Sequence, residues 1–140
     1  MAGYGQNEYL KIKVSTSDGV KLIVLLYEGA IKFLLNAQEA IREKNIVKRH
    51  NNIYRVLDII VELRNSLNFS LGGQIATSLN ALYLFMERHL ITANIQNDAQ
   101  KIQEVINMLS SLKEAWEAIA SRPEARKTTQ APGQSKGIRI

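Results

Sequence analysis

The stretch that decides the fold is VKLIVLLYEGAIKFLLNAQEAI, residues 20–41. On a helical wheel of about 100° per residue, its apolar side chains form one broad arc around the line of Ile23, Ala30 and Leu34. The arc covers roughly 240°, whereas a helix that faces one core needs little more than about 100°. Two explanations stay open. Either the helix is central in a bundle, or it presents a second apolar face to a partner.

Capping residues and helix breakers divide the chain into four helices. The caps and breakers are Ser17, Asn45, the pair Gly72-Gly73, and Asn97 or Asp98, with Pro123 beyond the last helix. The expected helices cover about residues 17–44, 46–67, 74–95 and 98–122. Because the connections are short, neighbouring helices must be antiparallel. We predict an all-α, up-down-up-down four-helix bundle.

The expected domain organisation is an extended N-terminal segment (1–16), the bundle (17–122) and a basic tail (123–140). The chain has 18 basic and 13 acidic residues. Five of the basic residues and one acid lie from residue 122 onward, so 13 and 12 remain before it. The tail's composition predicts disorder. We expect it to be solvated, with weak attraction to an acidic partner as the alternative.

The apolar pattern differs among the later helices. Helix four has a single seam from Ile102 to Ile119, as a simple bundle helix should. Helix two has two adjoining apolar lines, one of which includes Val56, Ile59 and Leu63. Helix three has a core line, and Leu84, Ile91 and Ile95 lie nearly opposite. The members of that expected core line are Ile75, Leu79, Leu82, Tyr83, Met86, Leu90 and Ala93.

Nothing in the sequence indicates an enzyme, a cofactor or a metal. A di-iron bundle requires a glutamate three positions before each histidine ligand. His50 and His89 both lack this glutamate, and we expect both at the surface. Gly72-Gly73 has no strand before it and is no phosphate loop. The basic residues of helices one and two alternate with acids, so we expect no nucleic acid partner. Arg64 on the core line of helix two leaves an anion-binding enzyme as a remote alternative.

Three further features bear on location. The chain has no cysteine, and its first residues lack the basic and apolar regions of a secretory signal. Its most hydrophobic segment, residues 20–35, is interrupted by Lys21, Glu28 and Lys32, so we expect no membrane insertion. These features predict a protein of the cytoplasm.

Several motifs in order along the chain carry a family resemblance. They are Tyr9, Val14-Ser15-Thr16-Ser17, the run from Leu26 to Leu34, Leu67-Asn68, Ile75-Ala76, Leu79, Leu82-Tyr83, Met86, Ala93-Asn94, Asn97-Asp98, Glu104-Val105 and Trp116. In their order and spacing the chain resembles the flagellar secretion chaperones of the FliS type. One departure is Ser17-Asp18-Gly19, where the family usually has proline and acidic residues after the cap. Glycine there predicts a looser first turn.

The resemblance implies a monomeric helical bundle that binds the disordered C-terminal region of flagellin, one chaperone per cargo chain. Binding would prevent premature polymerisation and keep flagellin competent for export, and components of the flagellar export apparatus are further possible partners. A helix-binding adaptor for another cargo is the strongest rival, because apolar grooves do not name their ligand. The residues we expect at the flagellin-binding surface are Tyr9, Val14, Leu22, Leu26, Tyr27, Phe33, Val56, Ile59, Leu63, Leu84 and Ile91.

The segment 9–14, with sequence YLKIKV, alternates apolar and charged residues. That pattern suits an extended strip over an apolar surface. We predict that it is a latch over part of the cargo groove, and an ordinary flexible terminus is the alternative.

Overall fold

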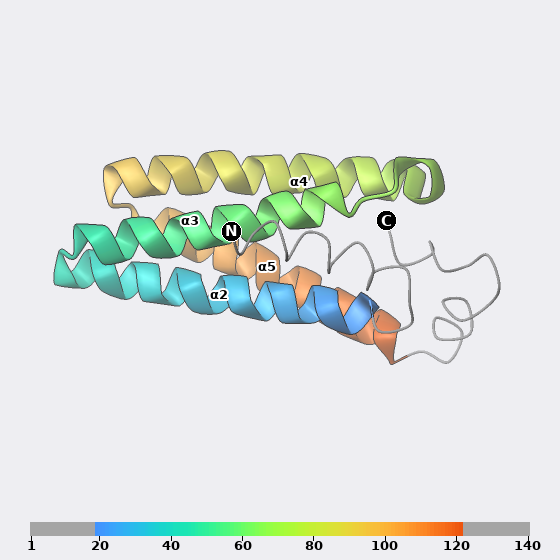
Figure 1. Ribbon diagram of the computed structural model, residues 1–140, viewed down its shortest axis with the longest axis horizontal. Helices are drawn as coiled ribbons and strands as arrows, with labels where there is room; N and C mark the ends of the chain where they lie inside the picture. The colour runs from blue at the N-terminus through green and yellow to red at the C-terminus, as the bar shows by residue number, and fades with distance from the viewer. Residues whose placement is uncertain (1–18, 122–140) are drawn as a thin grey trace.

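The computed structural model describes residues 19–121, which form four helices (Figure 1). They are α2 (Gly19–Glu43), α3 (Ile46–Asn65), α4 (Phe69–Gln96) and α5 (Ala99–Ala120). Helix α2 contacts α3 and α5, and α4 contacts the same two, so α2 and α4 are diagonally opposed. This arrangement confirms the predicted all-α, up-down-up-down bundle. The expected N-terminal segment (1–16), the cap Ser17 and the tail (123–140) lie outside the described residues.

Two of the predicted helix caps are confirmed. The side chain of Asn45 accepts a hydrogen bond from the backbone N–H of Lys48 at 3.0 Å, before α3. Asp98 accepts from the N–H groups of Gln100 and Lys101 at 3.1 and 3.0 Å, before α5. These bonds satisfy donors that have no partner within the first helical turn. Short polar side chains therefore set the starts of both helices.

The third helix starts at Phe69, one turn before the predicted residue 74, although the predicted break at the glycine pair is present. Asn68 accepts a hydrogen bond from the Leu71 N–H at 3.1 Å, and α4 begins at Phe69. One helical turn follows, and then Gly73 takes a φ of 52° and a ψ of −124°. Side chains rarely permit that backbone conformation, so glycine is needed there. The glycine pair does break the helix, but the break is a kink inside α4.

A hydrogen-bonded trio crosses the core and joins three helices. The hydroxyl oxygens of Tyr27 and Tyr83 are 2.6 Å apart, and Trp116 Nε1 donates to the Tyr27 hydroxyl at 3.0 Å. Burial raises the pKa of Tyr27, and it raises that of Tyr83 well above its usual value. Both phenols are therefore neutral at physiological pH. The trio connects α2 to its diagonal neighbour α4 and to α5.

No helix within residues 19–121 combines the length and the apolar character needed to cross a membrane.

Candidate partner-binding surface

Most of the wide apolar arc of α2 belongs to the core. Ile23, Ala30 and Leu34 are buried. Among the flanking side chains of α2, Leu35 is 50% exposed, and most of the others are half-buried and pack against the same core cluster. The arc is wide because α2 contacts two helices. Of the two explanations that the sequence left open, the central helix accounts for most of it.

Three of the residues expected at the partner surface are instead in the core. Tyr27 and Val56 are 0% exposed and Leu63 is 1% exposed. Tyr27 is held inside by its bonds to Tyr83 and Trp116. Val56 and Leu63 are buried because α3 contacts both α2 and α4, although Val61 of the same helix is 40% exposed. For these three residues the expectation of a surface position is wrong.

Four other expected residues line the seam between α2 and α3. Leu22, Leu26, Phe33 and Ile59 are all half-buried and pack against the core cluster. The seam is partly covered, because the guanidinium carbon of Arg55 lies 5.5 Å from the centroid of the Phe33 ring. This seam can therefore offer only a narrow apolar strip to a partner.

Of the remaining expected residues, Leu84 is half-buried, and Ile91 is 45% exposed. Ile91 and Ile95 are both exposed on α4, as expected for a second apolar face of that helix. Tyr9 and Val14 lie outside the described residues.

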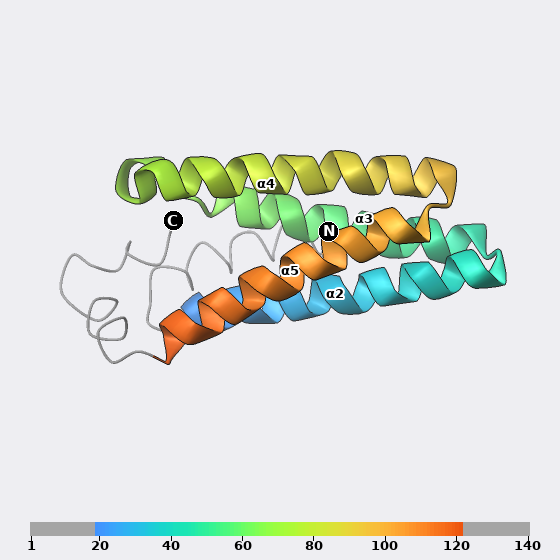
Figure 2. The same ribbon diagram turned by 180° about the vertical axis from the view of Figure 1, so that it is seen from behind.

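The exposed apolar side chains concentrate on α4. Ile75 is 63% exposed, Leu71 58%, Phe69 51% and Phe85 37%. The sequence-based position of Ile75 on a core line is therefore wrong. The reason is visible in Figure 2, where α5 lies close to α4 near their connecting turn and then diverges from it toward the end of α5. The first half of α4 thus lacks a neighbour on this flank.

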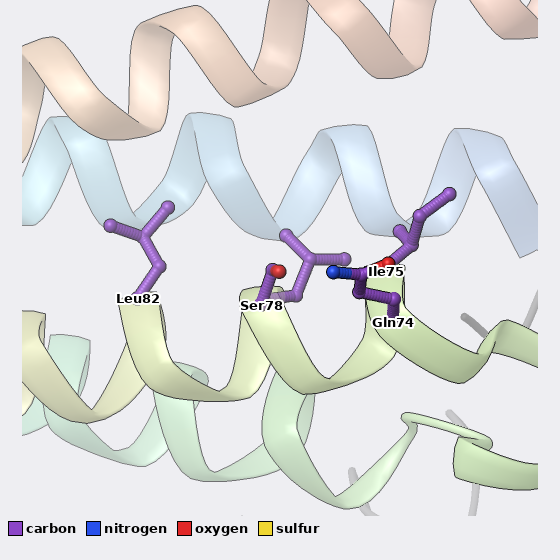
Figure 3. Close-up of a pocket in the computed structure, with 5 residues that line it drawn as sticks. Gln74, Ile75, Ser78 and Leu82 are labelled. Atoms are coloured by element: carbon purple, nitrogen blue, oxygen red, sulfur yellow. The ribbon is translucent and has the colours of Figure 1, made fainter.

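That flank of α4 is hollowed, as the close-up in Figure 3 shows. The hollow has a volume of about 450 Å³ and is lined by Gln74, Ile75, Ser78, Leu79 and Leu82, all from α4. Ile75, Leu79 and Leu82 are spaced i, i+4 and i+7, so they form one stripe along two helical turns. We call this hollow the α4 groove. It contains no charged side chain, and its stripe matches the apolar face of a docked helix.

Three contacts hold α4 in place next to the α4 groove. Toward the α4–α5 turn, His89 Nε2 lies 2.6 Å from Glu104 Oε1 of α5 and so ties the two helices together. The ring of Phe85 stacks on His89, with centroids 4.8 Å apart. His89 is therefore a half-buried bridge and not the surface histidine that we expected; His50 is exposed. Beneath the groove, the bonds of Tyr83 to Tyr27 hold α4 in place.

Arg64 does not form an inward-facing anion site. Its guanidinium donates to Glu87 Oε2 at 2.9 Å and to Asn80 Oδ1 at 3.3 Å, across the joint between α3 and α4. Its side chain is 32% exposed. The arginine therefore joins two helices at the surface.

Sequence reasoning missed Phe85 and placed Ile75 in the core. A helical wheel gives the width of an apolar arc, but it cannot show where a neighbouring helix diverges. The glycine pair in the first turns of α4 was the available indication that this end of the helix differs from the rest.

Comparisons with known proteins show to which family this chain belongs. A family model described as "Flagellar protein FliS" matches residues 1–123. The chain belongs to the FliS family. It is similar to three proteins named flagellar secretion chaperone FliS. The one from Campylobacter jejuni is 36% identical over 81% of this chain and 88% of its own length. The Vibrio cholerae protein is 35% identical over 88% of this chain and 92% of its own length. The Salmonella typhimurium protein is 37% identical over 78% of this chain and 82% of its own length.

The FliS family is a family of chaperones for flagellar secretion, which confirms the resemblance read from the sequence motifs. The surface described above presents exposed aliphatic side chains on a fixed helical frame. The match to the FliS family includes the whole described bundle, since the matched residues extend from before α2 to beyond α5.

Proposed function

We propose that this chain is a cytoplasmic chaperone that binds the disordered C-terminal region of flagellin. One monomeric chaperone binds one flagellin chain, prevents premature polymerisation and keeps the cargo competent for export. The observation that supports the proposal most is the α4 groove, together with membership in the FliS family. No catalytic step is part of the proposed role.

The physical argument starts from the cargo. A segment that polymerises through apolar helices exposes those apolar faces when it is unassembled. The stripe of Ile75, Leu79 and Leu82 offers a complementary apolar face of similar period. Docking buries aliphatic area on both sides, and each Å² removed from water contributes roughly 25 cal/mol. Ordering the cargo consumes about 2–5 kcal/mol or more of this energy.

The α4 groove is the primary docking stripe in this proposal. The seam of Leu22, Leu26, Phe33 and Ile59 and the flank with Leu84 and Ile91 are secondary contacts. A cargo that folds as it binds can follow surfaces on several helices, because its chain has no fixed shape beforehand. Contact with components of the export apparatus belongs to the same proposal, since a chaperone for export must release its cargo there.

The test is a calorimetric titration of the purified protein with full-length flagellin and with flagellin that lacks its C-terminal region. We expect binding at one to one for the first and none for the second. Equal affinity for both, or no affinity for either, would refute the proposal. A third titration uses an unrelated amphipathic helical peptide, and binding as tight as that of flagellin would instead indicate a general helix-binding adaptor.

A groove variant makes the test specific to the surface. Ile75→Ser should weaken flagellin binding, whereas Leu25→Ser should not. Leu25 is a matched control because it is 60% exposed, close to the 63% of Ile75, and it lies on α2, diagonally opposite α4.

A further inference from the structure

A second exposed apolar patch lies at the end of the bundle that contains the α2–α3 and α4–α5 turns (Figure 1). Ile95 is 76% exposed, Val47 68% and Ile46 65%. Within residues 19–121, these are the three most exposed large hydrophobic side chains. Ile46 and Val47 begin α3, and Ile95 lies in the last turn of α4. With Arg42, Lys44 and Arg49, they make up what we call the turn-end patch.

The turn-end patch has a fixed frame. Arg49 Nε donates to Asn94 Oδ1 at 2.7 Å, and its Nη1 donates to Asn97 Oδ1. These bonds connect the first turns of α3 to the last turn of α4, on either side of Ile95. The cap at Asn45 fixes the start of α3. A preformed surface loses little conformational entropy when a partner binds, which favours docking.

This end of the bundle is also basic. Residues 39–50 and 94–101 contain Arg42, Lys44, Lys48, Arg49 and Lys101, against Glu39, Glu43 and Asp98. Both glutamates pair with Lys48, at 2.5 and 3.2 Å, and Asp98 caps α5. Arg42, Lys44 and Arg49 have no ion-pair partner in the described part of the chain. Three basic side chains without an ion-pair partner and three exposed aliphatic ones are thus at the same end of the bundle.

We propose that the turn-end patch is a docking site for an amphipathic segment of a second protein, with acidic residues flanking two or three apolar ones. Apolar side chains of the segment would cover Ile46, Val47 and Ile95, and its carboxylates would face Arg42, Lys44 and Arg49. Charge complementarity selects the acidic partner and speeds its association. Exposed aliphatic groups gain nothing from phosphates, so the chemistry favours a protein segment over nucleic acid.

The turn-end patch is separate from the α4 groove. Leu82, at one limit of the groove, and Ile95 are 13 residues apart on α4, which corresponds to about 20 Å along the helix. Ile91, a secondary cargo contact, is one helical turn from Ile95, so cargo in the α4 groove leaves the turn-end patch free as long as it does not extend past Ile91. A chaperone that holds cargo in the groove could be recognised at its other end by a protein that does not compete with the cargo.

The test uses a fluorescein-labelled helical peptide of about 18 residues, with leucines spaced i, i+4 and i+7 and glutamates on both flanks. Its affinity is measured by anisotropy, and the contacted residues by amide NMR shifts of the labelled full chain. We expect shifts at Ile46, Val47 and Ile95. The double variant Val47→Ser, Ile95→Ser should lose at least about tenfold in affinity, and so should Arg42→Glu, Lys44→Glu.

Two controls keep the result interpretable. Leu25→Ser removes a similarly exposed side chain on another helix and should leave peptide binding unchanged. Both patch variants should bind flagellin as the unchanged chain does, and circular dichroism should show intact helices. Loss of flagellin binding in the patch variants would overturn the proposal, because the patch would then be part of the cargo surface.

Two other outcomes would also overturn it. A peptide with lysines in place of the glutamates must bind much more weakly, and equal binding would contradict the charge argument. A single-stranded RNA oligonucleotide that shifts the same amides, with affinity unaffected by Val47→Ser, Ile95→Ser, would identify the patch as a nucleic acid site.

Discussion

Truncation of Ile75 to alanine should separate affinity from stability. Ile75 is 63% exposed, so little more than a third of its surface is buried in the free protein. Burying a whole isoleucine side chain contributes about 1.5–3 kcal/mol, so the variant should lose only about 0.5–1 kcal/mol of unfolding free energy. Leu34 is 0% exposed. Its truncation should therefore cost about 2–5 kcal/mol.

The expected effects on cargo binding are reversed. A well-placed apolar anchor contributes about 2 kcal/mol or more to an interface, so Ile75→Ala should weaken flagellin binding by roughly 30-fold. Leu34→Ala should change affinity little wherever the bundle remains folded. Leu25→Ala, at a similar exposure of 60%, should cost as little stability as Ile75→Ala and leave affinity unchanged.

The assay combines urea denaturation, followed by circular dichroism, with anisotropy of a labelled peptide from the flagellin C-terminal region. The reasoning is refuted if Ile75→Ala and Leu25→Ala bind the peptide equally well. It is also refuted if Ile75→Ala loses as much unfolding free energy as Leu34→Ala, because Ile75 would then be a core residue.

Four further predictions concern the core and the ends of the chain. Tyr27→Phe should lower the unfolding free energy, measured by urea denaturation, by about 2–4 kcal/mol, because the buried Trp116 N–H and the Tyr83 hydroxyl lose their hydrogen-bond partner. Tyr83→Phe should lower it by only about 1 kcal/mol. Since burial raises the pKa of both tyrosines above 10.0, stability should be complete below about pH 10 and fall as the pH rises beyond it, measured as melting temperature. Truncation after Arg122 should leave the melting temperature and the flagellin affinity nearly unchanged. Deletion of residues 1–14 should lower the melting temperature and speed cargo association in stopped-flow mixing, if the segment is a latch.

Each of these four has a contrary result. Equal losses of unfolding free energy for Tyr27→Phe and Tyr83→Phe would contradict the central position of Tyr27 in the hydrogen-bonded trio. A flat melting temperature from pH 10 to 12 would contradict the raised pKa values. A large affinity loss that persists in high salt would show that the tail contacts cargo directly. For the N-terminal deletion, slower association with unchanged melting would make the segment a cargo contact, and no change in either would make it an ordinary terminus.

The sequence predicted the helical elements because their determinants are local. Apolar periodicity defined all four helices, and Asn45 and Asp98 begin helices as their capping chemistry requires. The break at the glycine pair was predicted, but α4 starts one turn earlier than predicted because Asn68 caps a turn that precedes the kink at Gly73. Two glycines indicate a break in a helix, but they do not tell whether the turn before the break is helical.

The partner surface depended on how the helices cross, and this was only partly predictable. Residues on a wide arc can be covered by either neighbour. Tyr27, Val56 and Leu63 proved to be core, and Ile75 proved to be exposed.

By itself, then, the amino-acid sequence determined that the chain forms four amphipathic helices with an excess of apolar surface and the motif order of the FliS family. Periodicity, caps and breakers act over a few residues, so they can be read without knowledge of the fold. Only the tertiary structure decided where the excess lies. Because α5 diverges from the first half of α4 (Figure 2), the groove is on α4, while most of the apolar arc of α2 is covered by its two neighbours. Exposure depends on the distance between helices that are far apart in the sequence, and no local pattern encodes that distance.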